Sequence, residues 1–155
     1  MNPPFSRLAL IGVGYIGGSV ALAARQTGLV GSVVGFDVDP RASQQGHARG
    51  ILDEIADEPA AAVAGAELVL LAAPVGSLPT LIDRIAPHLA PSVTVIDVGS
   101  VKRPVVARAD LALPGGQFVA CHPMAGAEHM GVAAADPGIF AGRVCFICPG
   151  SRTRA

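Results

Sequence analysis

A glycine-rich segment near the start of the chain has the spacing of a phosphate-binding loop. The segment GVGYIG (12–17) reads G-x-G-x-x-G, follows an apolar stretch and opens a stretch of helical spacing. In this pattern the first glycine permits a tight turn, the second lets a pyrophosphate approach the backbone, and the third allows close helix–sheet packing. The N–H groups at the helix N-terminus then bind phosphate oxygens. The segment predicts a dinucleotide site that includes Gly12, Gly14, Tyr15, Ile16 and Gly17.

Asp37 is the second residue that such a site requires. It ends the next predicted strand, about 20 residues after the loop, where an acidic side chain binds the ribose hydroxyls of a dinucleotide. A carboxylate there repels a 2′-phosphate, so the sequence favours NAD over NADP, and Arg41 nearby would weaken that preference. Pro74, just after the apolar stretch 67–73, is also expected to contact the cofactor. The alternative is a plain turn at 12–17, with Asp37 as a solvated loop acid.

Two polar segments in the second half of the chain carry side chains suited to proton transfer. DVGSVK contains Ser100 and Lys102, the only lysine of the chain, and HPMAGAE contains His122 and Glu128. Each segment follows a predicted strand, and in an open parallel sheet ligands bind beyond the carboxyl ends of the strands. We therefore expect both segments to project toward the place where the nicotinamide ring would lie.

Each of these four residues also has a plainer structural explanation. Ser100 precedes a predicted helix and is suited to be its N-cap. His122 could be a structural histidine at the end of a strand. Glu128 and Lys102 could be solvated surface charges.

Cys145-x-x-Cys148 has the spacing of a metal or redox motif. The segment is apolar and strand-like, however, so its two cysteine side chains point to opposite faces. No second pair completes a four-ligand zinc site, although Cys121, His122 and His129 occur elsewhere in the chain. We therefore predict buried core cysteines and no metal site. Three cysteines form no disulfide framework, which favours a reducing, cytoplasmic location.

Short apolar stretches alternate with longer stretches of helical spacing along the chain. The predicted strands are 7–12, 32–37, 67–73, 93–98, 118–121 and 144–148, and the predicted helices are 15–27, 40–48, 59–65, 78–89 and 101–111. The stretch 51–57 is ambiguous between a loop and a short strand. Apolar strands alternating with helices indicate an α/β fold with a doubly wound, mostly parallel sheet of the Rossmann type.

Length and composition limit the possible classes of protein. The 155 residues suggest one domain, predicted over 5–149 and followed by a short polar tail at 150–155. With 51% hydrophobic and 15% charged residues, the chain does not have the composition of a disordered protein. A net charge of −1 and 4% aromatic residues argue against nucleic-acid binding. The apolar stretch 8–24 superficially resembles a signal peptide, but its glycine spacing and its length argue against secretion and against a membrane span.

Several motifs resemble those of the prephenate dehydrogenase family, with its arogenate-using and cyclohexadienyl relatives. They are GVGYIGGS (12–19), DVGSVK (97–102), HPMAGAE (122–128) and IFAGRVCFICP (139–149), within a resemblance that spans about residues 5–149. The second and third motifs together are far more specific than the glycine loop. In that family the histidine is the catalytic group, the serine lies beside it and the nicotinamide, and the glutamate lies at the mouth of the substrate pocket. The resemblance implies these roles for His122, Ser100 and Glu128.

The chain departs from the family pattern in two ways. His129 and Met130 stand where the family usually has a lysine and a small residue. The family also carries a helical dimerisation domain, which supplies an arginine for the substrate carboxylate and is absent from these 155 residues. The resemblance therefore implies the cofactor-binding half of an enzyme, inactive alone, which forms a homodimer only together with the second domain.

The activity that the resemblance implies is the NAD-dependent oxidative decarboxylation of prephenate to 4-hydroxyphenylpyruvate in tyrosine biosynthesis. A neutral imidazole at His122 would accept a hydrogen bond from the substrate hydroxyl and stabilise the developing carbonyl. Three alternatives stay open: an arogenate dehydrogenase, another reductase of the β-hydroxyacid type, and a non-catalytic NAD-binding module.

Overall fold

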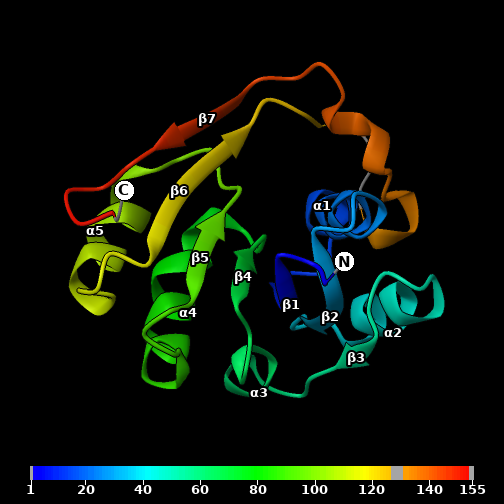
Figure 1. Cartoon of the computed structure of the whole chain (residues 1–155), viewed down its shortest axis with the longest axis horizontal. Coiled ribbons are helices and arrows are strands. Elements are labelled where there is room, and N and C mark those ends of the chain that lie inside the picture. Colours follow the sequence, from blue (N-terminus) through cyan, green and yellow to red (C-terminus); the bar gives the residue numbers. More distant parts are fainter. Residues whose placement is uncertain (1, 127–130, 154–155) are drawn as a thin grey trace.

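The computed structural model describes residues 2–126 and 131–153. These residues form a seven-stranded sheet in the order β3-β2-β1-β4-β5-β6-β7 (Figure 1). Its strands are β1 (Phe5–Ile11), β2 (Val30–Phe36), β3 (Glu54–Ile55), β4 (Leu68–Leu71), β5 (Thr94–Asp97), β6 (Phe118–Pro123) and β7 (Cys145–Cys148). The first six are parallel, and β7 is antiparallel to β6. The predicted doubly wound, mostly parallel sheet is confirmed.

Helices connect the parallel strands at the positions that the sequence predicts, with shifts of a few residues at their ends. They are α1 (Tyr15–Gln26), α2 (Pro40–Ala48), α3 (Pro59–Val63), α4 (Leu78–Ile85) and α5 (Arg103–Ala112), with short 3-10 turns η1 (Val75–Ser77), η2 (Ala86–His88), η3 (Val132–Ala134) and η4 (Pro137–Phe140). The helix predicted over 78–89 ends at Ile85 because Pro87 has no N–H to donate to the preceding turn. In the described part of the chain, no helix combines the length and apolar character that crossing a membrane requires.

Each face of the sheet has its own apolar core, because side chains alternate along the central strand β1. Leu8 and Leu10 pack in the core that includes residues of α1. Ala9 and Ile11 pack in the core formed with α3, α4 and α5. All four side chains are at most 1% exposed, which explains why residues 8–11 of this strand are apolar at every position rather than at every second one.

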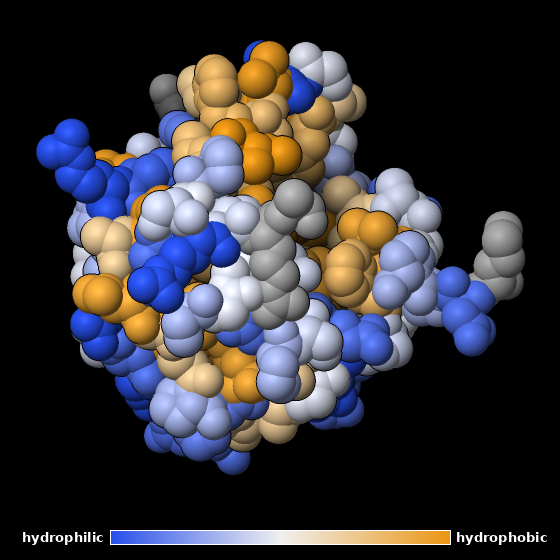
Figure 2. All heavy atoms as spheres, turned by 60° about the vertical axis from the view of Figure 1, so that its left-hand side comes forward, coloured by the Kyte–Doolittle hydropathy of each residue, from blue (hydrophilic) through white to orange (hydrophobic). Residues whose placement is uncertain are grey.

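Strand β7 differs from its sequence-based interpretation. Within residues 2–126 and 131–153 it lies at the edge of the sheet and pairs with β6 alone, so the outer side of its backbone has no partner strand there. Phe146 is 53% exposed and Ile147 65% exposed, while Cys145 is exposed and Cys148 half-buried. The prediction of buried core cysteines is therefore wrong, because no described helix covers the outer face of this strand. Figure 2, which brings this side of the molecule forward, shows hydrophobic patches between hydrophilic residues.

The described part of the segment between β6 and β7 packs against α1, on the opposite half of the sheet (Figure 1). Val132 and Ala135 are buried in the same core as α1. The N–H of Asp136 donates to Ser19 Oγ at 3.0 Å. The Arg49 guanidinium, just after α2, donates to the carbonyl oxygens of Val132 and Ala135. These contacts hold the segment over the carboxyl ends of the strands.

The glycine loop provides a matched test of packing. A Cβ at Gly17 would lie 2.5 Å from the carbonyl oxygen of Gly12 and 2.9 Å from Ala72 Cβ, whereas a Cβ at Gly14 would meet nothing within 4 Å. We expect Gly17→Ala to lower the free energy of unfolding by an amount at the upper end of the about 1–3 kcal/mol typical of overpacking. Gly14→Ala should cost about 0.5 kcal/mol, the loss of a favourable N-cap residue. Urea denaturation of both variants measures the difference, and equal losses would contradict the packing shown here.

Candidate functional site

Two adjoining cavities lie at the carboxyl edge of the sheet, beyond the ends of β1, β2 and β4. The first, of about 310 Å³, lies between the end of β2 and the start of α4. The second, of about 410 Å³, lies against the start of α1. Gly12, Asp37, Ala73 and Pro74 line both, so the two cavities form one groove across the end of β1. The chain reverses its direction across the sheet between β1 and β4, the place where open α/β sheets bind ligands.

The glycine loop forms the floor of the second cavity. Gly12 has a φ of +98°, and a Cβ there would lie 2.5 Å from the backbone of Ala72, so only glycine fits. Gly14 is the N-cap of α1 and makes no side-chain cap, which leaves N–H groups of the first turn available to a ligand. The space around Gly14 is open. Tyr15 and Ile16 also line this cavity, so the helix N-terminus faces the groove.

The carboxylate of Asp37 supports the loop from the neighbouring strand. Its Oδ2 accepts the N–H of Val13 at 2.7 Å, and its Oδ1 accepts the N–H of Asp39 at 2.9 Å. Each carboxylate oxygen can accept a further hydrogen bond, so both stay able to bind a ribose hydroxyl. Asp37 thus has a structural function beyond the ribose contact that the sequence predicts. Arg41, expected near this site, is exposed and lies outside the lining of both cavities.

The first cavity includes residues that sequence reasoning missed. Phe36 and Leu81 give it apolar walls, while Ser77, Thr80 and Arg84 form a polar edge along α4. Residues 77, 80, 81 and 84 have the spacing of one helix face. That spacing, in a helix that follows a predicted strand, is the feature of the sequence from which this cavity wall could have been predicted. Arg84 forms an ion pair with Glu58, in which Nη2 lies 2.5 Å from Oε2. An apolar slot with a polar edge suits a planar heteroaromatic ring.

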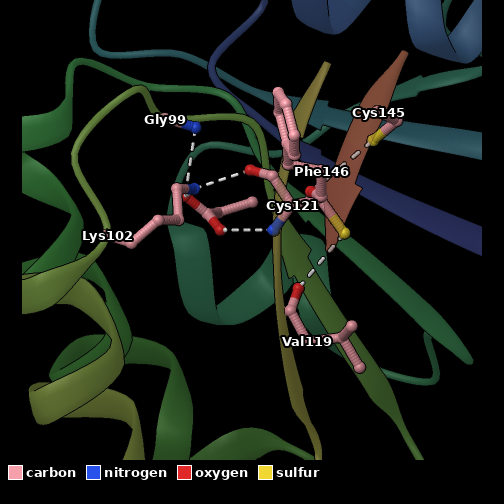
Figure 3. A network of polar contacts seen from close by, with 7 residues as sticks. Gly99, Lys102, Val119, Cys121, Cys145 and Phe146 are labelled. Carbon is pink, nitrogen blue, oxygen red and sulfur yellow. Dashed lines mark hydrogen bonds and ion pairs between the residues drawn. The ribbon is translucent and has the colours of Figure 1, made fainter. Parts of the chain in front are cut away.

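A buried polar network joins the ends of β5 and β6 (Figure 3). Asp97, at the end of β5, is 0% exposed, and its Oδ2 lies 2.5 Å from Lys102 Nζ. The same oxygen accepts the N–H of Gly99 at 3.0 Å. Asp97 Oδ1 accepts the N–H of Cys121 at 3.2 Å, and Lys102 Nζ donates to the carbonyl oxygen of Cys121 at 2.6 Å. Lys102, whose side chain is 16% exposed, is therefore a largely buried partner of Asp97 and not a solvated surface charge.

Burial keeps the thiol of Cys121 in its neutral form. Loss of hydration on burial, reinforced by the nearby groups Cys145 and Asp97, raises the pKa of Cys121 to about 11. A neutral thiol is a poor nucleophile and a poor metal ligand. Among the residues that the structure describes, no three His, Cys, Asp or Glu side chains are grouped so as to hold a metal ion.

The structure brings together only part of the predicted site. Gly17 lies beneath the loop rather than on the cavity surface. His122, half-buried on β6, and the exposed Ser100 lie outside the lining of the two cavities. Ser100 is also not a helix cap, because α5 begins at Arg103 and its N-cap is Lys102. Glu128 lies outside the described residues.

Residues just beyond His122 connect β6 with the groove. Ala125 and Gly126, of the same HPMAGAE segment, line the second cavity together with Gly12 and Gly14. The histidine-bearing strand therefore leads directly into the wall of the cavity that the glycine loop forms.

Comparison with known proteins agrees with this geometry. The family model described as "Prephenate dehydrogenase, nucleotide-binding domain" matches residues 20–155. The chain belongs to this family. Prephenate dehydrogenase of Bacillus subtilis (strain 168) is 34% identical over 155 residues, which cover 99% of this chain and 42% of that protein. Cyclohexadienyl dehydrogenase of Zymomonas mobilis is 32% identical over 151 residues, which cover 97% of this chain and 52% of that protein.

A solved prephenate dehydrogenase shares the fold of this chain. The crystal structure of the Aquifex aeolicus enzyme in complex with hydroxyphenyl propionate and NAD⁺ superposes with a TM-score of 0.89 at 29% identity. The match covers 96% of this chain and 52% of that one. The chain thus spans about half the length of the prephenate dehydrogenases that it matches.

The hydrogen bond between Asp37 and Val13 can be tested without a ligand. Asp37→Ala leaves the N–H of Val13, a residue that is 1% exposed, without its acceptor. We expect this variant to lose about 1–3 kcal/mol of stability, the cost of an unsatisfied buried group. Asp37→Asn retains an acceptor oxygen and should lose clearly less. Chemical denaturation of the two variants measures both values, and an equal loss would show that the hydrogen bond does not support the loop.

Proposed function

We propose that this chain forms the cofactor-binding part of a dehydrogenase that converts prephenate to 4-hydroxyphenylpyruvate by oxidative decarboxylation, with NAD⁺ as cofactor. The observation that carries the proposal is the shared wall of the second cavity. Ala125 and Gly126, shortly after His122, line the same cavity as Gly12 and Gly14. A histidine that leads into a dinucleotide groove is suited to act on a substrate bound beside the cofactor.

The residues of the groove fit a dinucleotide. Open space at Gly14 admits a pyrophosphate, and the first turn of α1 offers N–H groups to it. Asp37 would bind the adenosine ribose, and the slot between Phe36 and Leu81 would take the adenine ring. Pro74 borders both cavities at the centre of the groove. When bound, NAD⁺ supplies the acceptor for the hydride that leaves the hydroxyl-bearing carbon.

His122 would work on the oxygen of that carbon. Its imidazole accepts the hydrogen bond, and then the proton, of the substrate hydroxyl as this oxygen becomes a carbonyl. The ring carboxylate then leaves as CO₂, and its bonding electrons complete the aromatic ring. The ring oxygen takes the proton back from the imidazole, which gives the phenol of 4-hydroxyphenylpyruvate and restores neutral His122. Ser100 is proposed to orient the imidazole or to contact the carboxamide of the cofactor. Glu128 is proposed to lie at the mouth of the substrate pocket.

The remaining wall of the substrate site would have to come from residues that correspond to the part of the relatives outside the match. The curated relatives are about twice as long, since the matches cover 42% and 52% of them. The exposed apolar residues Phe146 and Ile147 of β7 offer a surface on which such a part could pack. We therefore expect these 155 residues alone to bind NAD⁺ but to oxidise prephenate negligibly. A cytoplasmic location fits the three free thiols.

Cofactor preference tests the assignment of Asp37. We expect NAD⁺ to bind at least about tenfold more tightly than NADP⁺, which corresponds to about 1.4 kcal/mol. Asp37→Asn should narrow this difference, because the variant removes the negative charge that repels the 2′-phosphate and keeps an acceptor for Val13. Isothermal titration calorimetry with both nucleotides gives the ratio. Equal affinities in the parent protein would overturn the ribose assignment.

Turnover tests the assignment of His122. A chimera of this chain with the remaining part of the Bacillus subtilis relative should oxidise prephenate, and assays with arogenate determine its substrate preference. In this chimera His122→Asn should lower kcat by about 10²-fold or more, with little change in NAD⁺ affinity. His88→Asn, an exposed histidine in η2, is the matched control and should retain the parent rate. A normal kcat for His122→Asn would refute the proposed mechanism.

A further inference from the structure

Strand β6 extends beyond the end of its neighbour β5, at the point where His122 lies. The register between the two strands ends with Asp97 opposite Ala120. The next residue of β6 is Cys121. Its N–H and carbonyl oxygen point to the β5 side, but β5 has no further residue there to pair with them. On its other side, β6 remains paired with β7, where His122 lies opposite Phe146.

Two side chains replace the missing strand. Asp97 Oδ1 accepts the N–H of Cys121 at 3.2 Å, and Lys102 Nζ donates to its carbonyl oxygen at 2.6 Å (Figure 3). The carboxylate and the ammonium group thus satisfy both backbone groups of the residue that precedes His122. Without them, two polar groups of a half-buried residue would lose their partners.

The loop between β5 and α5 is shaped to bring Lys102 into this position. Gly99 donates its N–H to Asp97 Oδ2, and a Cβ at Gly99 would lie only 3.1 Å from that oxygen. The absence of a side chain at Gly99 lets the loop fold back over the carboxylate. The Lys102 side chain is then 16% exposed and lies 2.5 Å from Asp97, which is 0% exposed.

We propose that Lys102 and Asp97 are positioning residues for His122, acting through the backbone of Cys121. The proposal rests on the proposed function of His122. A buried ion pair contributes little net stability, because the loss of hydration offsets most of its attraction. Its directional hydrogen bonds, in contrast, fix the backbone next to the imidazole, and catalysis is sensitive to displacements of about 1 Å.

The test compares three variants. Lys102→Met removes the ammonium group but leaves the Asp97 carboxylate buried and uncompensated, which could prevent folding. The double variant Asp97→Asn/Lys102→Met removes both charges and keeps a similar volume, so it tests the same contact without that penalty. Arg108→Met breaks the exposed pair between Arg108 and Asp83 and serves as the control for losing an ion pair elsewhere on α5.

We expect specific changes at β6 in the 155-residue chain. In Lys102→Met and in the double variant, the side chain of residue 97 loses the ammonium group that holds it, and the carbonyl oxygen of Cys121 loses its donor. The bond from the Cys121 N–H to residue 97 is then less firmly held, so amide hydrogen exchange at Cys121 should become about tenfold faster or more. The His122 imidazole resonances should shift or split, and the affinity for NAD⁺ should stay within about twofold, since the groove is untouched. In the prephenate-oxidising chimera, kcat should fall by about 10- to 10²-fold with little change in KM. Arg108→Met should alter none of these quantities.

The two proposals fail in distinguishable ways. If both Lys102 variants fold and show parent-like exchange at Cys121 and parent-like kcat, the positioning inference is wrong whatever His122 does. If Lys102→Met speeds amide exchange at Cys121 while His122→Asn leaves kcat unchanged, the function proposed for His122 is wrong. Lys102 and Asp97 would then position a strand that takes no part in catalysis. A fall in kcat equal to that of Arg108→Met would also overturn the inference, because it would reflect general destabilisation.

Discussion

The turn between β1 and α1 lies so close to the end of β4 that a single methyl group at Gly12 would overlap the backbone of Ala72. This contact determines much of the molecule. It places the N-terminus of α1 directly over the carboxyl edge of the sheet, where helix N–H groups face the groove. It also brings Val13 within reach of Asp37 from the neighbouring strand. A larger residue at this turn would displace the helix start, the groove floor and the acidic side chain together.

The second half of the sheet is organised by a different constraint. There the strands become unequal in length, and β6 continues beyond β5 toward the groove. Backbone ladders cannot satisfy the part that extends, so the buried carboxylate of Asp97 and the ammonium group of Lys102 do so instead. A glycine turn thus defines one side of the groove, and a pair of opposite charges holds the strand that leads to its other side.

The central strands of the sheet are covered by other elements much more completely than the edge strand β7. Around β1 and β4 both faces of the sheet are covered by helices, and the described segment between β6 and β7 adds a further layer over α1. At β7 the apolar side chains of Phe146 and Ile147 face solvent. Exposed apolar residues on an edge strand favour association with another surface. The groove therefore lies at the part of the sheet that is covered on both faces, away from the exposed edge strand.

Residue types along the chain are enough to predict the α/β architecture, the loop over 12–17 and the position of Asp37 just after the next strand. These features depend on local rules: buried parallel strands are apolar at every position, and a G-x-G-x-x-G turn needs its glycines wherever it occurs. Four features became visible only in three dimensions: Lys102 pairs with Asp97, Asp37 also binds the Val13 backbone, Arg84 borders the groove, and β7 is antiparallel and exposed. Each of these depends on which distant segments meet, or on whether any segment covers a strand. The apolar pattern of CFIC is the same for a buried and an uncovered strand. The residue types of this segment therefore do not show whether another element packs against it.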